Sequence, residues 1–206
     1  MKIKSIKAIP VNLAPIPKTK PRVAPDLDGG YFVSPMDRYK YDSPGRTWTD
    51  NWNKAACIVT AEDGTWGLGI TVASGPVCSI INDHFSELLV GQNAMATEKN
   101  WDMMRRASSA HGTAGMQSYA ISAVDNAIWD LKGKLLGKPV YELLGGPVKE
   151  DIFCYASNTM LKYKTSDYMD WFLELGFKAV KVFLRHGPEE GLSGLNKNVD
   201  IVAKTR

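Results

Sequence analysis

The sequence is poor in cysteine, in long apolar runs and in excess charge of either sign. It contains 3 cysteines, Cys57, Cys78 and Cys154, whose odd number and wide spacing predict neither a disulfide scaffold nor a paired-cysteine metal site. No stretch approaches the ~18 apolar residues of a membrane helix. The N-terminus also lacks the apolar core and cleavage site of a secretory signal. We therefore expect a cytoplasmic protein with no membrane partner.

The charge balance argues against a nucleic-acid partner. The 206 residues carry 25 Lys and Arg against 22 Asp and Glu, a net charge of +3 that is scattered along the chain. Such a small charge cannot create the strong field on which non-specific nucleic-acid binding depends. Hydrophobic residues make up 44% of the chain, which is enough for a folded core and argues against disorder.

The first part of the chain predicts three antiparallel strands. Residues 3–13 alternate between apolar and lysine side chains, which is typical of a strand. Residues 54–61 and 66–72 are apolar runs on either side of Asp63-Gly64, a strong hairpin signal. Together these segments predict a three-stranded antiparallel meander.

The segment Pro15–Arg46 has a different composition. It contains six prolines, four aspartates and a Gly29-Gly30 pair, with little apolar periodicity. A long loop of this kind is uncommon inside a compact domain, and when ordered it often acts as a lid or binding loop. A disordered insertion is the alternative.

Helices are predicted after the hairpin. An apolar stripe over residues 80–89 predicts a helix that begins near Ser79 or Asn82 and ends at Gly91, and a second helix is expected over 101–108. The clearest helix spans 121–135, where apolar residues repeat at three and four positions. Gly137 ends it and Pro139 prevents its return.

After residue 150 the pattern changes to strand, helix, strand, helix. The expected elements are a buried strand at 152–157, a helix at 166–175 with Trp171, Phe172 and Leu175 inward, a strand at 177–184, and a helix after His186-Gly187-Pro188. This rhythm is typical of a parallel sheet. Two parallel strands cannot cover their own faces, so we interpret the sequence as truncated at Arg206, with a small α+β protein as the alternative.

Two positions stand out as candidates for chemistry. Lys181 lies on the expected strand 177–184, on the face opposite Lys178, and an amine in an apolar strand is costly unless it meets a ligand or partner. A lysine snorkelling at the strand end is the alternative. Arg46 ends the proline-rich segment and could hold a carboxylate, although a surface arginine is the commoner case. For His84 a packed or surface position is favoured over chemistry, whereas His111, in a glycine-rich loop, could face a ligand or solvent. Asp125 and Asp130 of the expected helix 121–135 are expected to hold loops or cap neighbouring segments.

Residues 120–146 resemble the helix and linker that join the two domains of enolase-superfamily proteins, in the mandelate racemase branch. The resemblance implies an α+β capping domain over residues 1–140, with a three-stranded antiparallel meander and helices. The start of a truncated (β/α) TIM-like barrel would follow over residues 150–206. Segments 34–46, 66–85 and 176–194 are similar to the L-rhamnonate dehydratase group within that branch.

The resemblance implies a magnesium-dependent sugar-acid dehydratase. In that family a base removes the α-proton, Mg²⁺ stabilises the resulting enediolate, and water leaves to give a 2-keto-3-deoxy sugar acid. The Mg²⁺ ligands would follow Arg206, so the 206-residue chain alone would be inactive. The full-length protein would be a homo-oligomer. Alternatives are a dehydratase for arabinonate, galactonate or mannonate, another mandelate racemase-like enzyme, or a non-catalytic remnant or scaffold.

The resemblance also assigns individual residues. Lys181 matches the first lysine of the family's Lys-x-Lys motif and is the catalytic candidate, while Phe183 replaces the second lysine, which acts as a base in many members. This replacement favours the dehydratases, in which a His-Asp pair on later strands is the base. Arg46 matches an arginine that contacts substrate from the capping-domain loop. No metal ligand is assigned in this chain.

Overall fold

The structure is a computed structural model that describes residues 1–11, 33, 35, 38, 52–157, 165–182, 184 and 186–205. It divides into two compact units. The first holds the described residues of 1–14 and 50–148, and the second holds the described residues of 15–49 and 149–206.

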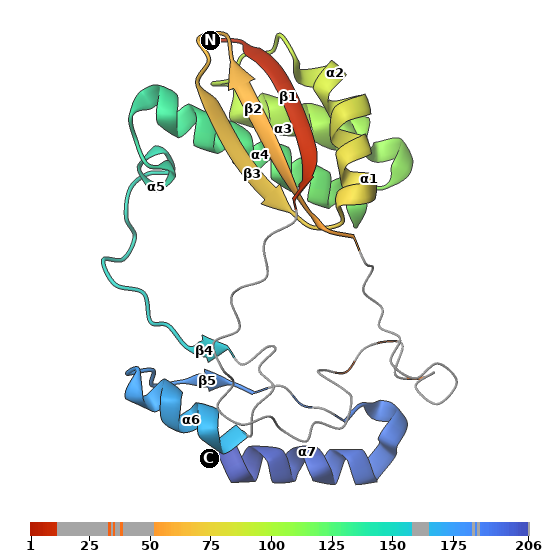
Figure 1. Cartoon of the computed structure of the whole chain (residues 1–206), viewed down its shortest axis with the longest axis vertical. Helices are drawn as coiled ribbons and strands as arrows, with labels where there is room; N and C mark the ends of the chain where they lie inside the picture. The colour runs from red at the N-terminus through yellow and green to blue at the C-terminus, as the bar shows by residue number, and fades with distance from the viewer. Residues whose placement is uncertain are drawn as a thin grey trace. The chain divides into compact units, whose positions relative to one another are not determined.

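The first unit is built on an antiparallel sheet of three strands, in the order β1-β2-β3 (Figure 1). The strands are β1 (Ile3–Val11), β2 (Lys54–Ala61) and β3 (Trp66–Thr71). The β2–β3 turn closes on a hydrogen bond of 2.8 Å from the Ala61 N–H to the Thr65 carbonyl, and Gly64 adopts a φ of +88°. The predicted meander and its hairpin are therefore confirmed.

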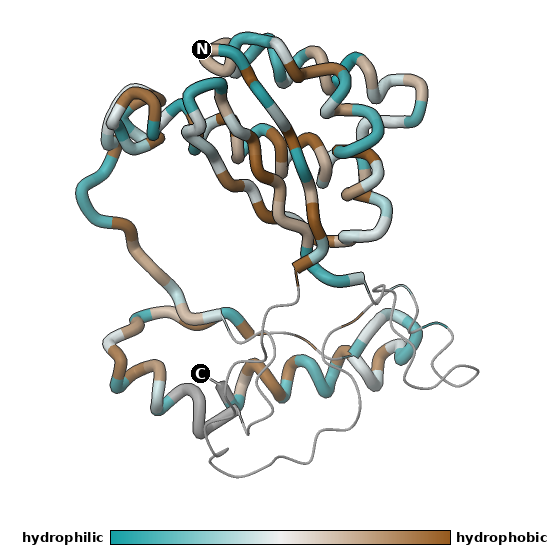
Figure 2. Tube along the Cα trace, turned by 45° about the horizontal axis from the view of Figure 1, so that its top comes forward, coloured by the Kyte–Doolittle hydropathy of each residue, from teal (hydrophilic) through white to brown (hydrophobic). Residues whose placement is uncertain are grey.

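Helices cover one face of this sheet. They are α1 (Ser74–Ser79), the π-helical turn η2 (Ile80–Phe85), α2 (Ser86–Leu89), α3 (Thr97–Ala107), η3 (Ser109–His111), α4 (Met116–Leu136) and α5 (Val140–Leu143). α4 ends where Gly137 adopts a left-handed conformation, as expected from its sequence. The fully buried side chains form one core between sheet and helices, including Val59, Phe85, Leu89, Ile128 and Leu131. Along β1 apolar residues alternate with lysine and serine, whereas β2 is apolar along most of its length (Figure 2).

The predicted start of the first helix was wrong. The helical segment begins at Ser74 and not near Ser79 or Asn82, because Pro76 lies in the first turn, where a missing N–H removes no hydrogen bond. Asn82 lies inside the helical segment, and its side chain bonds β1 instead of capping a helix. Its side chain accepts a hydrogen bond from the Ala8 N–H at 2.8 Å and donates one to the Ala8 carbonyl at 2.9 Å. Asn82 thereby binds the outer edge of β1.

The outer edge of β3 is also occupied by side chains. Asp130 accepts a hydrogen bond from the Leu68 N–H at 2.8 Å, and Lys134 donates one to the Trp66 carbonyl at 3.0 Å. The two side chains form an ion pair at 2.7 Å. Both come from α4, so this helix protects the edge strand from pairing with another chain. The expectation that Asp130 holds a neighbouring segment is confirmed.

α4 lies unusually close to β3, because β3 has glycine at both positions that face the helix. A Cβ atom at Gly67 would overlap the carbonyl oxygen of Ala127, and one at Gly69 would overlap that of Ala123. Neither glycine has a positive φ, so they are required for the close approach and not for backbone conformation.

The second unit contains a parallel βαβ arrangement. β4 (Ala156–Ser157) pairs in parallel with β5 (Val180–Lys181), and α6 (Thr165–Glu174) connects them. η4 (Pro188–Glu190) and α7 (Gly191–Thr205) follow. Phe172 of α6 is 7% exposed and packs with Ala156, Phe177 and Val180. The predicted strand-helix-strand-helix order is confirmed.

The extent of these strands was overestimated. Only the last two residues of the expected strand 152–157 form β4, and the preceding apolar side chains are exposed, with Ile152 at 79% and Phe153 at 71%. β5 is also limited to two residues of the expected strand. Trp171 and Leu175, expected to face inward, are 45% and 56% exposed. A sheet of two strands has too little surface to cover these side chains.

Candidate functional site

The carboxyl ends of β4 and β5 bring two polar residues together. Ser157 is the last residue of β4 and Lys181 the last of β5, and the parallel register places them opposite each other. Lys181 is exposed. In sheets whose parallel strands are joined by helices, ligands bind at the carboxyl ends of the strands. Lys181 therefore lies at the edge where a site is expected.

A compact set of polar contacts follows β5. The Nδ1 atom of His186 lies 2.8 Å from Oε2 of Glu190, and both side chains are only about one-fifth exposed, at 23% and 21%. Asn198 of α7 accepts a hydrogen bond from the His186 N–H at 3.2 Å and donates one to the His186 carbonyl at 2.8 Å. In the sequence, His186 marks the start of the next helix and belongs to the segment 176–194 that carries the resemblance, but it is not among the predicted site residues. The signal that the sequence analysis missed is the spacing of four residues between His186 and Glu190 at a helix start.

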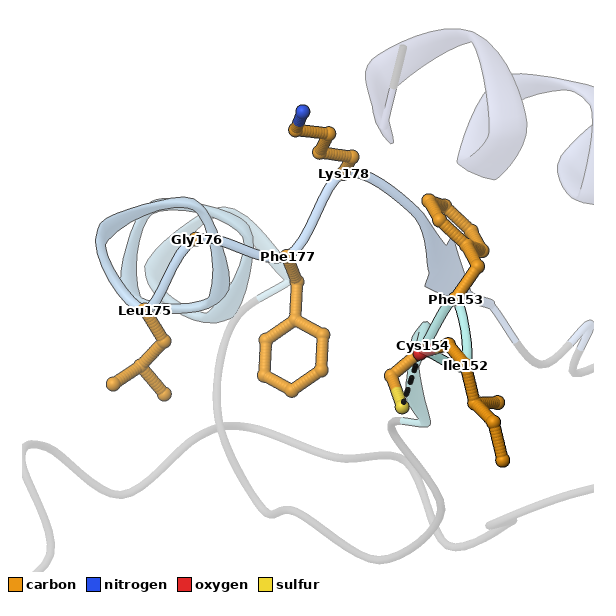
Figure 3. A pocket seen from close by; sticks show the side chains of 7 residues that line it. All are labelled: Ile152, Phe153, Cys154, Leu175, Gly176, Phe177 and Lys178. Atoms are coloured by element: carbon orange, nitrogen blue, oxygen red, sulfur yellow. Dashed lines mark hydrogen bonds between the residues drawn. The ribbon is translucent and has the colours of Figure 1, made fainter. Parts of the chain in front are cut away.

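A pocket in the second unit lies at the opposite edge of the parallel strands. Its volume is about 320 Å³, and it is lined by residues that come just before β4 and just before β5: Ile152, Phe153, Cys154, Leu175, Gly176, Phe177 and Lys178. Figure 3 shows the Lys178 side chain pointing away from Leu175 and Phe177. The thiol of Cys154 bonds the Ile152 carbonyl at 3.5 Å. Because the amino ends of barrel strands serve stability and not catalysis, we do not place the site here.

The metal expected from the resemblance does not fit this part of the chain. Across the described ranges, no group of three or more His, Cys, Asp or Glu side chains could hold a metal ion. Divalent magnesium needs several oxygen ligands in near-octahedral geometry. The described residues therefore do not supply a magnesium site.

Two residues named from the sequence, Arg46 and Phe183, lie outside the described residues, as does most of the segment Pro15–Arg46. His84 is half-buried beside Phe85, with ring centroids 5.4 Å apart, and His111 is exposed. Both arrangements agree with the packing and surface interpretations.

The environment of Cys57 does not favour a nucleophilic thiolate. Cys57 is buried in the core, and desolvation together with the nearby Cys78 raises the pKa of its thiol to about 12. A thiol of this kind stays protonated and unreactive. Cys78 and Cys154 are likewise free cysteines.

Asp125 of α4 is an acidic residue whose pKa is raised, first by burial and second by the nearby carboxylate of Glu98. A raised pKa in the folded state stabilises the protein below the unfolded value of ~3.9, and this contribution is lost as pH rises through the folded pKa. We therefore expect Asp125→Asn to raise the free energy of unfolding at pH 7 and to change it less at pH 3.5. Urea denaturation at both pH values measures this. The exposed Asp83→Asn is the control, and an equal gain at both pH values would contradict the assignment.

No helix within the described ranges combines the length and apolar character needed to cross a membrane.

Comparisons with known proteins match both units. The N-terminal domain model of the mandelate racemase / muconate lactonizing enzyme family matches residues 49–145. L-rhamnonate dehydratase from Saccharopolyspora erythraea is 43% identical over 148 residues, which cover 72% of this chain and 36% of that protein. These sequence matches identify the three-stranded unit as a capping domain of the enolase superfamily.

Solved structures extend the similarity along the chain. Rhamnonate dehydratase from Gibberella zeae, in complex with Mg, superposes with a TM-score of 0.78 at 28% identity over 99% of this chain and 49% of that one. The 3,6-anhydro-D-galactonate cycloisomerase from Zobellia galactanivorans superposes with a TM-score of 0.61 at 29% identity over 97% of this chain and 48% of that one. This chain thus spans less than half the length of each of these three relatives.

Proposed function

Because the chain belongs, through residues 49–145, to the mandelate racemase / muconate lactonizing enzyme family, we propose that the whole protein is a sugar-acid dehydratase, with L-rhamnonate as its first candidate substrate. Residues 1–140 would be its capping domain and 150–206 the start of its barrel. The observation that carries this proposal is the 43% identity to an L-rhamnonate dehydratase over 72% of the chain.

The proposed reaction is a β-elimination of water. A base removes the proton on the carbon next to the carboxylate, the negative charge spreads onto the carboxylate oxygens, and the β-hydroxyl leaves with a proton as water. The resulting enol becomes a 2-keto-3-deoxy acid. We assign Lys181 to the substrate carboxylate, where its ammonium group would stabilise the charge that develops in the transition state. Lys181 ends β5 at the carboxyl edge of the parallel strands, and this location supports the assignment.

Magnesium belongs to the proposal for the whole protein, because a similar rhamnonate dehydratase was solved with Mg. The described residues do not gather a metal-ligand set, and we propose that the ligands and the base come from later strands of the barrel, as the resemblance implies. We also propose that the whole protein is a homo-oligomer.

The function is tested with the whole protein and a panel of sugar acids. We expect a 2-keto-3-deoxy acid to form from L-rhamnonate, or from arabinonate, galactonate or mannonate if the specificity differs. In D₂O, we expect the enzyme to eliminate water and not to exchange the α-proton of both epimers of the substrate for deuterium. The reason is that Phe183 stands where other family members have a second lysine base, and phenylalanine cannot take a proton. Cyclisation, or exchange of the α-proton of both epimers without elimination, would instead favour the alternative of another mandelate racemase-like enzyme. No turnover of any sugar acid would favour a non-catalytic scaffold.

Arg46 is proposed to contact the substrate from the capping-domain loop. In the whole protein we expect Arg46→Ala to lower kcat/KM by tens-fold, or ~2–3 kcal/mol, because a charged hydrogen bond to the substrate is lost. Steady-state kinetics on the substrate found above measure this effect. Arg38→Ala, in the same proline-rich segment, is the matched control. Unchanged kinetics for Arg46→Ala would remove this arginine from the site.

A further inference from the structure

The contacts that follow β5 join a loop to the interior of a helix. We call His186, Glu190 and Asn198 the β5–α7 latch. Asn198 lies at the middle of α7 and is 9% exposed, and both the oxygen and the nitrogen of its side-chain amide bond the backbone of His186. Glu190 fixes the imidazole through Nδ1 and also lies 3.6 Å from the Lys197 ammonium. His186 is therefore held by its backbone and by its side chain.

Glycine makes room for this latch. A Cβ atom at Gly194 would lie 2.6 Å from Cβ of Glu190 and 3.1 Å from Cβ of His186. The first distance is shorter than real Cβ contacts and the second is tighter than most of them, so a larger residue at position 194 would displace Glu190 and press on His186. The close fit of three segments, at 186, 190 and 194, shows that the latch is a packed arrangement as well as a polar one.

The strand that precedes the latch is weakly held. β5 pairs with β4 over two residues only. A short strand has few ladder hydrogen bonds to fix its end, so the contacts that follow it along the chain help to hold it. Lys181 is five residues before His186. The position of its backbone therefore depends on where His186 is anchored.

We propose that the β5–α7 latch is a positioning device that sets the carboxyl end of β5 and so places Lys181 against the substrate carboxylate. This inference rests on the proposed function, since it needs Lys181 to act on the substrate. His186 is then a positioning residue that acts through Lys181 and makes no contact with substrate itself. Because Lys181 acts on charge that develops in the transition state, a loosened latch lowers kcat more than it changes KM.

The first test separates the two ring nitrogens of His186. An asparagine amide nitrogen can occupy the place of Nδ1, and a glutamine amide nitrogen that of Nε2. His186→Asn should retain the bond to Glu190 and keep kcat within about threefold, whereas His186→Gln should lower kcat by about tenfold or more. The opposite order, with His186→Gln active and His186→Asn impaired, would show direct contact through Nε2 and overturn the proposal.

The second test is a double-mutant cycle in the whole protein. Asn198→Ala should lower kcat by about tenfold in the native background and by less than about twofold when Lys181 is already methionine, because the latch then has nothing to position. Asn196→Ala, the same change at an exposed position of α7, is the matched control. Multiplicative effects of Asn198→Ala and Lys181→Met would show that the latch does not act through Lys181.

A readout without catalysis keeps the latch testable if the proposed function fails. Hydrogen exchange of the peptide that carries the His186 N–H should speed up in Asn198→Ala and not in Asn196→Ala, because only the first change removes an acceptor of that N–H. Unchanged exchange would overturn the latch itself. Faster exchange in a protein that turns over no sugar acid would leave the latch in place and overturn its assigned role in catalysis.

Discussion

Gly69→Ala should be among the most destabilising single changes in the capping domain, with an expected loss of ~3 kcal/mol or more in the free energy of unfolding. The added Cβ would overlap the carbonyl oxygen of Ala123 in α4. Overpacking in a core costs ~1–3 kcal/mol when side chains can move aside. Here the obstacle is helix backbone, so α4 must separate from β3. Urea denaturation followed by circular dichroism measures the loss.

The control for Gly69→Ala lies next to it on the same strand. Ile70 faces away from α4 and is 56% exposed, so Ile70→Ala should cost less than ~1 kcal/mol. Gly67→Ala should behave like Gly69→Ala, because its Cβ would overlap the Ala127 carbonyl. If both glycine variants were as stable as Ile70→Ala, the close approach of α4 to β3 would be wrong.

Lys181→Met should lower kcat/KM for the sugar acid by about 100-fold or more in the whole protein. Methionine keeps the length and apolar stem of lysine and removes only the ammonium group. A preorganised charge that stabilises an anionic transition state is commonly worth a factor of 10²–10³. Steady-state kinetics on the substrate identified from the panel give the result, and a thermal melt shows whether the variant remains folded.

Lys178 supplies the matched control for this prediction. It is an exposed lysine three residues earlier, at the pocket on the amino side of the parallel strands. Lys178→Met should leave kcat/KM within about twofold, because the amino ends of the strands face away from the expected site. Equal losses in the two variants would show that the effect is not specific to the carboxyl end of β5.

Local patterns in the sequence were sufficient for the order and type of most elements. The alternation in residues 3–13, the Asp63-Gly64 turn and the repeat over 121–135 predicted β1, the hairpin and α4, and the structure confirms them. These patterns succeed because each is set by contacts between near neighbours in the chain, or by one buried face of one element. The resemblance of residues 120–146 to a known family extended this to the capping-domain fold, which the comparisons confirm.

Local patterns failed where the outcome depends on surroundings. An apolar run predicts a buried strand over 152–157, yet Ile152 and Phe153 are exposed and only Ala156–Ser157 pair. An apolar run indicates only that a segment is suited to burial. Whether it is buried depends on whether another surface packs against it. At the start of the first helix, Pro76 is a local signal that fits a first turn, but the Ser74 N–H is held by the distant carbonyl of Asn53 at 2.9 Å, a contact that no local pattern shows.

For the candidate site as well, one part could be predicted from the sequence and the other part came from the tertiary structure. Lys181 could be singled out from the sequence, since a lysine in an apolar strand is unusual at any position. Its location opposite Ser157, and the latch of His186, Glu190 and Asn198 behind it, came only from the tertiary structure. Hydrogen bonds between residues twelve apart, and a glycine that clears space for two other side chains, leave no periodic signal in the sequence. The sequence by itself therefore determined which elements form and which family they belong to, whereas the tertiary structure decided which side chains meet, because that depends on packing between segments distant in the chain.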